Sequence, residues 1–252
     1  MTKIKKQLLL TAFILTAIVP KTYAVRPFIT DDGLVAGKGV LNYETWAYID
    51  REVKEHWTQL SFGATERLEF SVVGLWGFYK PKGGDNTFSY SLPLLEAKYL
   101  FCEFQPVKRP GIAVAVGSHL PWGTGEFVPP GRGAYGFLAT SYALDEKENV
   151  TFHGNFGMNY LYVNKENDWV PYWGLGSQVR AYKGLHIVGE VISGDPYAPG
   201  TGLAYQLGIR QFINEKMQLD VEFGQGLAGS DKIPFWVGFG FRMVIDTKWA
   251  KK

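Results

Sequence analysis

The sequence predicts an all-β fold: a closed, antiparallel transmembrane β-barrel of about 12 strands in an up-and-down meander. Apolar and polar residues alternate with a period of two along one segment after another, as in strands with one face in water. The polar positions carry charges, which an aqueous lumen would accept. The connections alternate between a few residues and longer stretches rich in Gly, Pro, Asp and Ser. Counts of ten or fourteen strands stay open, because strand boundaries are the least certain part of such a prediction.

Residues 1–24 have the features of a cleaved secretory signal peptide. Lysines at positions 3, 5 and 6 form a basic start, residues 8–19 are apolar, and Thr22-Tyr23-Ala24 supplies small residues before a cut. The mature chain would start at Val25. A membrane anchor would need roughly 20 apolar residues. Removing this leader, which holds four lysines and no acid, changes the formal net charge from +2 to −2. The charge therefore gives no reason to expect a nucleic-acid partner.

The remaining chain, about 228 residues, suits one all-β domain. Cys102 is the only cysteine, so an internal disulfide cannot stabilise this exported chain. A closed barrel provides stability in another way, because every strand is paired and no edge remains. We divide the mature chain into an N-terminal periplasmic segment, residues 25–38, and a transmembrane β-barrel, residues 39–252. The alternative is a soluble periplasmic sandwich, whose apolar faces would be buried between two sheets.

The alternation is plainest in the last quarter of the chain. Along residues 203–210 one set of alternate residues is Leu, Tyr, Leu, Ile and the other is Ala, Gln, Gly, Arg. Similar segments recur from residue 39 onwards. The expected strands are Gly39–Ile49, Glu55–Gly63, Arg67–Tyr79, Pro93–Phe104, Pro110–Leu120, Tyr135–Leu144, Asn149–Tyr162, Trp169–Ala181, Leu185–Ser193, Gly202–Ile213, Met217–Gly226 and Phe235–Ile245.

The connections between these strands predict which end of the barrel faces outward. Residues 64–66, 145–148, 183–184 and 214–216 are short charged or polar turns, whereas 80–92, 119–134, 194–201 and 227–234 are long. Short turns at one end and long loops at the other are typical of outer-membrane barrels. The connections at residues 50–54 and 164–168 are shorter than such outer loops usually are.

The parity of the strands predicts which side chains face the lumen. The apolar set, with Phe70, Phe156 and Phe239 among its members, would face lipid, where a charge costs roughly 2–4 kcal/mol near the midplane. A slip of one residue would exchange the two faces. The ionisable residues expected to line a channel are Glu44, Glu69, Glu96, Lys98, Arg180, His186, Glu190, Arg210, Asp220, Glu222 and Arg242.

Two interpretations of these inward charges stay open. Acids and bases of neighbouring strands, for example Arg210 with Asp220 or Glu222, can form a satisfied network that fills a narrow barrel. Alternatively, part of the network lines a solute path, because twelve strands enclose more space than eight. Six acids against four bases would give such a path a mild preference for cations or neutral solutes.

Aromatic residues near the strand ends are expected to lie at the membrane interfaces, and a site for aromatic solutes is the alternative. The loop after residue 119 is the best candidate for a lid or constriction, since it is long and carries aromatic and charged side chains between prolines. Its constriction candidates are Trp122, Glu126, Phe127 and Arg132.

The expected mature N-terminus carries a family resemblance. Residues 26–32, Arg-Pro-Phe-Ile-Thr-Asp-Asp, precede a glycine-containing segment and a first strand with Asn42-Tyr43-Glu44. This arrangement resembles the outer-membrane β-barrel family named for the meta-pathway of phenol degradation. The resemblance implies an exported barrel of a kind often labelled a transporter. The chain departs from the usual aromatic C-terminus of such barrels, since it continues past Trp249 to Ala250-Lys251-Lys252.

Signals for covalent chemistry are few. His153 and Asn155 share a strand face, and barrel lipases use Ser, His and Asn on such a face, but no serine stands at a neighbouring position of that strand. Asp31-Asp32 resembles half of a calcium site without the six or more oxygen ligands that calcium takes. No zinc-type spacing or complete phosphate loop is present. We therefore expect no catalytic residues, no metal and no cofactor.

These observations predict a non-enzymatic outer-membrane channel for passive uptake or efflux of small solutes, including aromatic or other hydrophobic compounds. Its expected partners are membrane lipids and lipopolysaccharide, a small-molecule solute and the outer-membrane assembly machinery. The alternatives are a lipid-acting barrel enzyme and a structural or adhesion barrel with a plugged lumen. The sequence does not identify the solute or the oligomeric state.

Overall fold

The computed structural model describes residues 26–198, 201–229 and 232–249. The expected leader, Val25 and the last three residues lie outside these ranges. Within the described ranges, no helix is long and apolar enough to cross a membrane.

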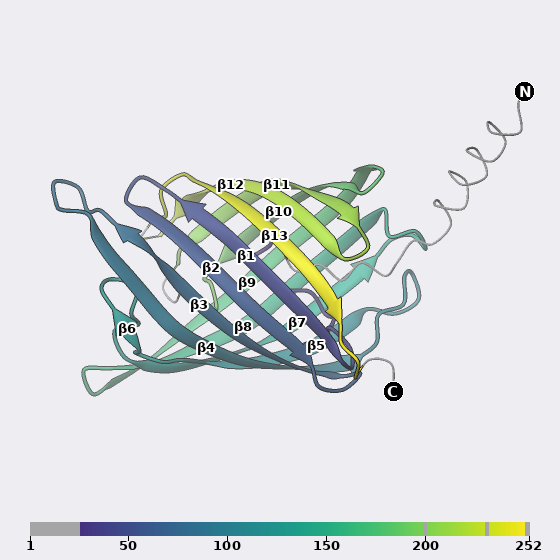
Figure 1. The fold of residues 1–252 in the computed structure, drawn as a ribbon, viewed down its shortest axis with the longest axis horizontal. Helices are drawn as coiled ribbons and strands as arrows, with labels where there is room; N and C mark the ends of the chain where they lie inside the picture. The colour runs from purple at the N-terminus through teal and green to yellow at the C-terminus, as the bar shows by residue number, and fades with distance from the viewer. Residues whose placement is uncertain (1–25, 199–200, 230–231, 250–252) are drawn as a thin grey trace, which may run out of the picture.

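A single antiparallel sheet of thirteen strands closes on itself to form the barrel (Figure 1). Each long strand pairs with its neighbours in sequence, and pairing of the first strand with the last completes the ring. One strand, β6, has two residues and belongs to a loop, so twelve strands build the wall. The prediction of a twelve-stranded meander is confirmed. The strands are β1 (Val40–Ile49), β2 (Val53–Gly63), β3 (Leu68–Tyr79), β4 (Thr87–Cys102), β5 (Gly111–His119), β6 (Gly123–Thr124), β7 (Arg132–Ala143), β8 (Val150–Val163), β9 (Glu166–Tyr182), β10 (Leu185–Ser193), β11 (Leu203–Asn214), β12 (Met217–Ala228) and β13 (Trp236–Asp246).

The two faces of the wall have the predicted parity. Phe70, Phe156 and Phe239 are 50%, 66% and 50% exposed, whereas the alternate positions carry buried polar side chains such as Glu44 and Arg210. Apolar side chains therefore cover the outer surface, and charged side chains are shielded inside. This inversion is that of a transmembrane barrel, in which lipid contacts the apolar face.

The two ends of the barrel differ in their connections. The short-turn end, at the right of Figure 1, holds residues 64–67, 103–110, 144–149, 183–184 and 215–216. The long-loop end, at the left, includes residues 80–86, 120–131, 194–198 and 201–202, together with the tight hairpins at residues 50–52 and 164–165.

One strand boundary differs clearly from its prediction. We expected residues 80–92 to be a loop, but β4 begins at Thr87, and residues 87–91 pair with β3. The register shifts between Val73 and Leu75 of β3, opposite Leu92 and Pro93. Because proline donates no backbone hydrogen bond, a strand that contains one is often irregular at that point. Pro93 was expected to be the first residue of the strand. It lies inside β4 instead, at the point where the pairing with β3 is irregular.

Residues 26–36, hereafter the N-terminal segment, lie inside the barrel. We expected residues 25–38 to form an N-terminal periplasmic segment. Instead, Arg26, Phe28, Thr30 and Asp32 are all less than 10% exposed. The reason is chemical complementarity: the segment offers backbone groups and charges to polar side chains of the inner wall, which are described next.

Candidate functional site

The site is the barrel lumen, and the structure places the predicted channel-lining residues on its inner wall. Ten of the eleven are buried, and Arg180 is half-buried. Two parts of the chain fill the lumen and bury these side chains. The N-terminal segment fills the half nearer the short-turn end, and aromatic side chains with an inward-folded loop fill the half nearer the long-loop end.

The N-terminal segment follows the inner wall from strand to strand. It contacts β12 at Arg26, β11 at Pro27 and β10 at Ile29 and Thr30. It then contacts β8, β7, β4 and β3 through residues 31–36. No residue of the segment belongs to a strand of the described sheet. The wall therefore holds the segment through side chains.

Polar wall side chains bind the backbone of the segment. The Glu190 carboxylate accepts hydrogen bonds from the backbone N–H groups of Ile29 and Thr30, at 2.7 and 2.8 Å. The Asn155 amide accepts from the N–H of Asp31 at 2.6 Å and donates to its carbonyl at 2.8 Å. Unpaired backbone groups inside a protein are costly, so these contacts satisfy groups that the segment would otherwise leave buried and unpaired.

The same pattern continues at both ends of the segment. Gln218 donates to the carbonyl of Arg26 at 2.9 Å, and Gln206 donates to that of Pro27. Further along, Ser141 Oγ accepts from the N–H of Gly33 at 2.8 Å, and Glu69 accepts from the N–H of Ala36 at 2.6 Å. Six wall side chains on six strands thus contact the backbone of this one segment.

Ion pairs fix the direction of the segment. The Arg26 guanidinium lies 2.6 Å from Glu222 Oε1 and 3.4 Å from Asp220 Oδ1, and it stacks over the ring of Trp46. On the opposite wall, Lys98 Nζ lies 2.6 Å from Asp31 and 3.3 Å from Asp32. These groups are almost fully buried, where an ion pair is strong only if both partners are present.

Glycines of the wall make room for the segment. A Cβ at Gly63 would lie 1.7 Å from the carbonyl oxygen of Gly37, and a Cβ at Gly174 would lie 2.3 Å from Thr30 Oγ1. A Cβ at Gly111 would lie 2.6 Å from the carbonyl oxygen of Gly33. Side chains at Gly63 and Gly111 would meet backbone atoms of Gly37 and Gly33 and would force this part of the chain away from the wall, whereas a Cβ at Gly174 would meet the Thr30 side chain.

The predicted pairing of Arg210 with Asp220 or Glu222 is not what the structure has. Both acids bind Arg26, while Arg210 donates to Gln178 and lies over the ring of Phe28. The inward network therefore closes partly through the N-terminal segment and partly within the wall, where Arg242 Nε of β13 lies 3.3 Å from Glu44 Oε1 of β1. If wall residues alone formed the network, Asp220 and Glu222 would lack Arg26, the base that lies nearest to them.

An aromatic cluster occupies the half of the lumen nearer the long-loop end. Tyr135, Phe137 and Tyr172 are buried on inward faces, and Tyr197 of the loop between β10 and β11 packs against them. The hydroxyls of Tyr135 and Tyr197 both donate to Glu96, at 3.0 and 3.2 Å. Sequence reasoning missed this cluster. The inward parity of Tyr135 in β7 and Tyr172 in β9 was the available signal.

The loop expected to form a lid lies along the wall. Within it, β6 pairs with Tyr90 and Ser91 of β4, and the N–H of Glu126 donates to Ser89 Oγ at 3.0 Å. Trp122 is 60% exposed, Glu126 and Arg132 are exposed, and Phe127 is half-buried. The early start of β4 leaves a strand edge that this loop covers. The loop that enters the barrel is residues 194–198.

Asp195, in the inward-folded loop, titrates in an accessible pH range. Its carbonyl accepts from Asn159 Nδ2 at 3.1 Å, and its carboxylate accepts from the N–H of Tyr197 at 2.7 Å. Burial raises the pKa of the Asp195 carboxyl to about 6 from its ordinary value of 3.8. Inside the barrel, the Asp195 carboxyl therefore keeps its proton to a higher pH than an aspartic acid side chain in water does. The stabilisation this gives is complete below pH 3.8 and is lost as the pH rises through about 6.

We expect the loop at residues 194–198 to become less protected from hydrogen exchange as the pH rises from about 4 to 7. Asp195→Asn should remove this dependence, because an amide does not titrate. Exchange of the loop peptide, measured by mass spectrometry and corrected with an unfolded reference, tests this. Equal pH dependence in the wild type and the variant would contradict it.

The histidine singled out from the sequence has a serine on the neighbouring strand. Ser141 Oγ of β7 lies 2.9 Å from His153 Nδ1 of β8. The pair is buried, Phe28 lies over the imidazole, and the serine oxygen accepts from Gly33. The Ser141–His153 pair faces the lumen, whereas membrane lipid contacts the outer face of the barrel, so the pair is not placed to meet lipid there. In the described ranges, no group of three or more His, Cys, Asp and Glu side chains has the arrangement of a metal site.

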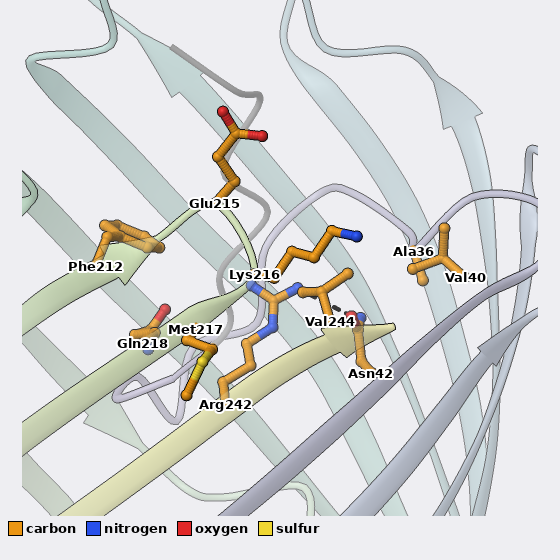
Figure 2. A pocket seen from close by; sticks show the side chains of 10 residues that line it. All are labelled: Ala36, Val40, Asn42, Phe212, Glu215, Lys216, Met217, Gln218, Arg242 and Val244. Atoms are coloured by element: carbon orange, nitrogen blue, oxygen red, sulfur yellow. Dashed lines mark hydrogen bonds between the residues drawn. The ribbon is translucent and has the colours of Figure 1, made fainter. Parts of the chain in front are cut away.

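Two cavities lie at the short-turn end. The smaller, about 50 Å³, is large enough for a few water molecules and is drawn in Figure 2. There Arg242 points toward Asn42, and Lys216 extends past Val244 toward Ala36 and Val40 (Figure 2). The larger is an open cleft of about 630 Å³ below the N-terminal segment, lined in part by Leu34, Val35 and Phe104.

Together, the closed sheet, the apolar outer face and the charged inner face define a transmembrane β-barrel of porin-like architecture. The chain belongs to the family described as "Putative MetA-pathway of phenol degradation", whose model matches residues 24–235. The resemblance found at residues 26–32 is thereby confirmed. No curated protein matches the chain by sequence.

Several solved structures share the fold. An outer membrane channel from Pseudomonas putida F1 has 15% identity and a TM-score of 0.55, and the match covers 90% of this chain and 100% of that one. The NanC porin has 8% identity and a TM-score of 0.53, over 82% and 99% of the two chains. The KdgM porin in complex with disordered oligogalacturonate has 9% identity and a TM-score of 0.55, over 81% and 98%.

Proposed function

We propose that the chain is a passive channel of the outer membrane for small solutes, exported through a cleaved signal peptide. The observation that carries the proposal is the inverted barrel: an apolar outer face suited to lipid and an inner wall of ionisable side chains suited to water. Membership of the family and the channel folds of its structural neighbours support it. Membrane lipids, lipopolysaccharide and the barrel assembly machinery are the partners that such a location requires.

The inner wall favours neutral or cationic solutes. Its six acids outnumber its four bases, which is a poor match for the polyanionic oligogalacturonate bound by the KdgM porin. Tyr135, Tyr172 and Tyr197 provide flat apolar surfaces beside a carboxylate, Glu96, which suits small aromatic compounds. We therefore infer that aromatic alcohols and amines are better solutes than sugar acids.

A second candidate is a structural barrel with a plugged lumen, which the position of the N-terminal segment favours. Planar-bilayer conductance and liposome swelling separate the two. Each is measured for the wild type and for a variant without residues 26–36, with aromatic alcohols, aromatic amines, sugars and sugar acids. A channel conducts ions and admits aromatic solutes at least when the segment is absent and the loop at residues 194–198 moves away from the aromatic cluster. Silence of both proteins, in vesicles where each is folded, would favour the structural barrel.

A further inference from the structure

We propose that the lumen beside β1 and β2 binds a small organic ammonium ion, that is, a protonated amine or a quaternary ammonium. This cation site is made by aromatic and acidic side chains of the first hairpin and of the inward-folded loop: Trp46, Tyr48, Asp50, Glu55, Trp57 and Asp195. As a solute class for the channel, this ligand rests on the proposed function, whereas the binding itself does not.

The inner face of β1 and β2 is accessible from the lumen. Near the long-loop end, where the two strands join in a hairpin (Figure 1), Trp46, Tyr48, Glu55 and Trp57 have the inward parity of Glu44 and are half-buried. The inward tyrosines of β7 and β9, by contrast, are almost fully buried. The aromatic cluster and the inward-folded loop therefore leave the inner face of β1 and β2 open to a small solute.

Two indoles form the aromatic part of the cation site. Trp46 and Trp57 lie directly opposite each other across the sheet, with parallel rings whose centroids are 5.7 Å apart. One ring already holds a cation, because the Arg26 guanidinium lies 4.6 Å from the ring centroid of Trp46, and acids of β12 balance its charge. Among the described residues, no cation lies over Trp57. Aromatic faces attract cations, and tryptophan does so most strongly.

Three carboxylates of the cation site lack a basic partner. Trp57 Nε1 donates to Glu55 at 2.9 Å. The Tyr48 hydroxyl donates to Asp50 at 3.4 Å. The negative charges of Asp50 and Asp195 both act on Glu55, and none of these three acids forms an ion pair with a described residue. Because like charges repel more strongly where water is scarce, a cation between them lowers the energy of the site.

The combination of rings and acids selects an organic cation. A metal ion needs several ligands on one point, and within the described ranges no group of three or more His, Cys, Asp and Glu side chains has that arrangement. A neutral aromatic solute contacts the indoles and leaves the acids unbalanced. An ammonium ion with apolar substituents meets both, since its substituents pack on the ring faces while its charge lies near the carboxylates.

Binding is measured by isothermal titration calorimetry on the folded protein in a non-ionic detergent. A buffer of about pH 8 keeps Asp195 ionised, because the pKa of its carboxyl is about 6. The probes are benzyltrimethylammonium, benzyl alcohol and phenylmethanesulfonate, which share a benzyl group and differ in charge. We expect saturable binding of the ammonium probe and at least roughly 10-fold weaker binding of the other two. Equal binding of the three probes, or no binding of the ammonium probe, would overturn the proposal.

Variants locate the site. Glu55→Gln removes a charge but keeps an acceptor for Trp57, and it should weaken binding of the ammonium probe roughly 10-fold. Trp57→Leu should weaken it roughly 3- to 30-fold, the range of one cation–π contact. Glu103→Gln at the short-turn end and Trp169→Leu at an exposed position are the matched controls and should leave binding unchanged. If a site variant does not fold, Asp50→Asn, which keeps the acceptor of its turn, replaces it. Equal effects of site and control variants would overturn the proposal.

Conductance distinguishes failure of the cation site from failure of the channel. In planar bilayers, a current carried by the ammonium probe, together with its selective binding, supports both. Selective binding without conductance retains the cation site and contradicts the proposed channel. Conductance without selective binding retains the channel and overturns the cation site.

Discussion

Lys98→Met is expected to release the N-terminal segment from the lumen. Lys98 is the cation that lies against both Asp31 and Asp32, and all three side chains are almost fully buried. Removing one partner of a buried ion pair costs about 3–5 kcal/mol, because the other charge stays behind without compensation. The segment can avoid this cost by leaving for water. Its backbone amides should therefore exchange hydrogen roughly 10²- to 10³-fold faster.

The control for this prediction is Lys216→Met. Lys216 forms an exposed pair with Asp246 at 2.9 Å, and exposed pairs contribute less than about 1 kcal/mol. Exchange at residues 29–36 should not change in this variant. Adding Asp31→Asn and Asp32→Asn to Lys98→Met should restore part of the protection, since no uncompensated charge is then buried. Similar exchange in Lys98→Met and wild type would show that the ion pair does not hold the segment.

Phe156→Arg should destabilise the folded barrel in lipid by about 2–4 kcal/mol. Phe156 lies at the middle of β8, faces outward and pairs across the sheet with Leu138 and Trp173. The middle of a transmembrane strand crosses the centre of the hydrocarbon layer, where an arginine is poorly solvated.

Phe235→Arg is the matched substitution at the edge of the membrane. Phe235 is 53% exposed and directly precedes β13 at the long-loop end. The same change should cost only about 0–1 kcal/mol there. Reversible urea unfolding in phospholipid vesicles measures both. Equal costs at the two sites would contradict the assignment of the outer face to lipid.

The fold could be predicted from the sequence because it depends on a local pattern. Side chains of a strand alternate between faces, so charges at one parity of residues 203–210 or 217–226 identify the face that avoids lipid. The turns at residues 64–66 and 183–184 are marked by short polar stretches. The strand boundary at Pro93 was wrong because the proline interrupts β4, and the sequence alone does not show that pairing resumes on its other side.

The position of the N-terminal segment could not be predicted from any local pattern. Residues 26–36 have no strand or helix periodicity, and their partners are distant in sequence: Arg26 lies 196 residues before Glu222. The surplus of inward acids over bases did not point to the segment either, because the segment adds one cation, Arg26, and two carboxylates, Asp31 and Asp32. The lid was assigned to the loop at residues 120–132 for its length and for its aromatic and charged residues between prolines. These features do not show whether a loop covers a strand edge or enters a lumen.

A reversible crosslink between the segment and the wall tests the central claim, that the N-terminal segment closes the proposed channel in the half nearer the short-turn end. A Cβ at Gly174 would lie 3.3 Å from the Cβ of Thr30, close to the separation in a disulfide. Thr30→Cys with Gly174→Cys, in a Cys102→Ser background, should therefore form a bond on oxidation. Conductance is recorded in one bilayer before and after a reductant is added, with the single-cysteine variants as controls. We expect silence while the bond is intact and openings after its reduction; equal conductance in both states would contradict the account.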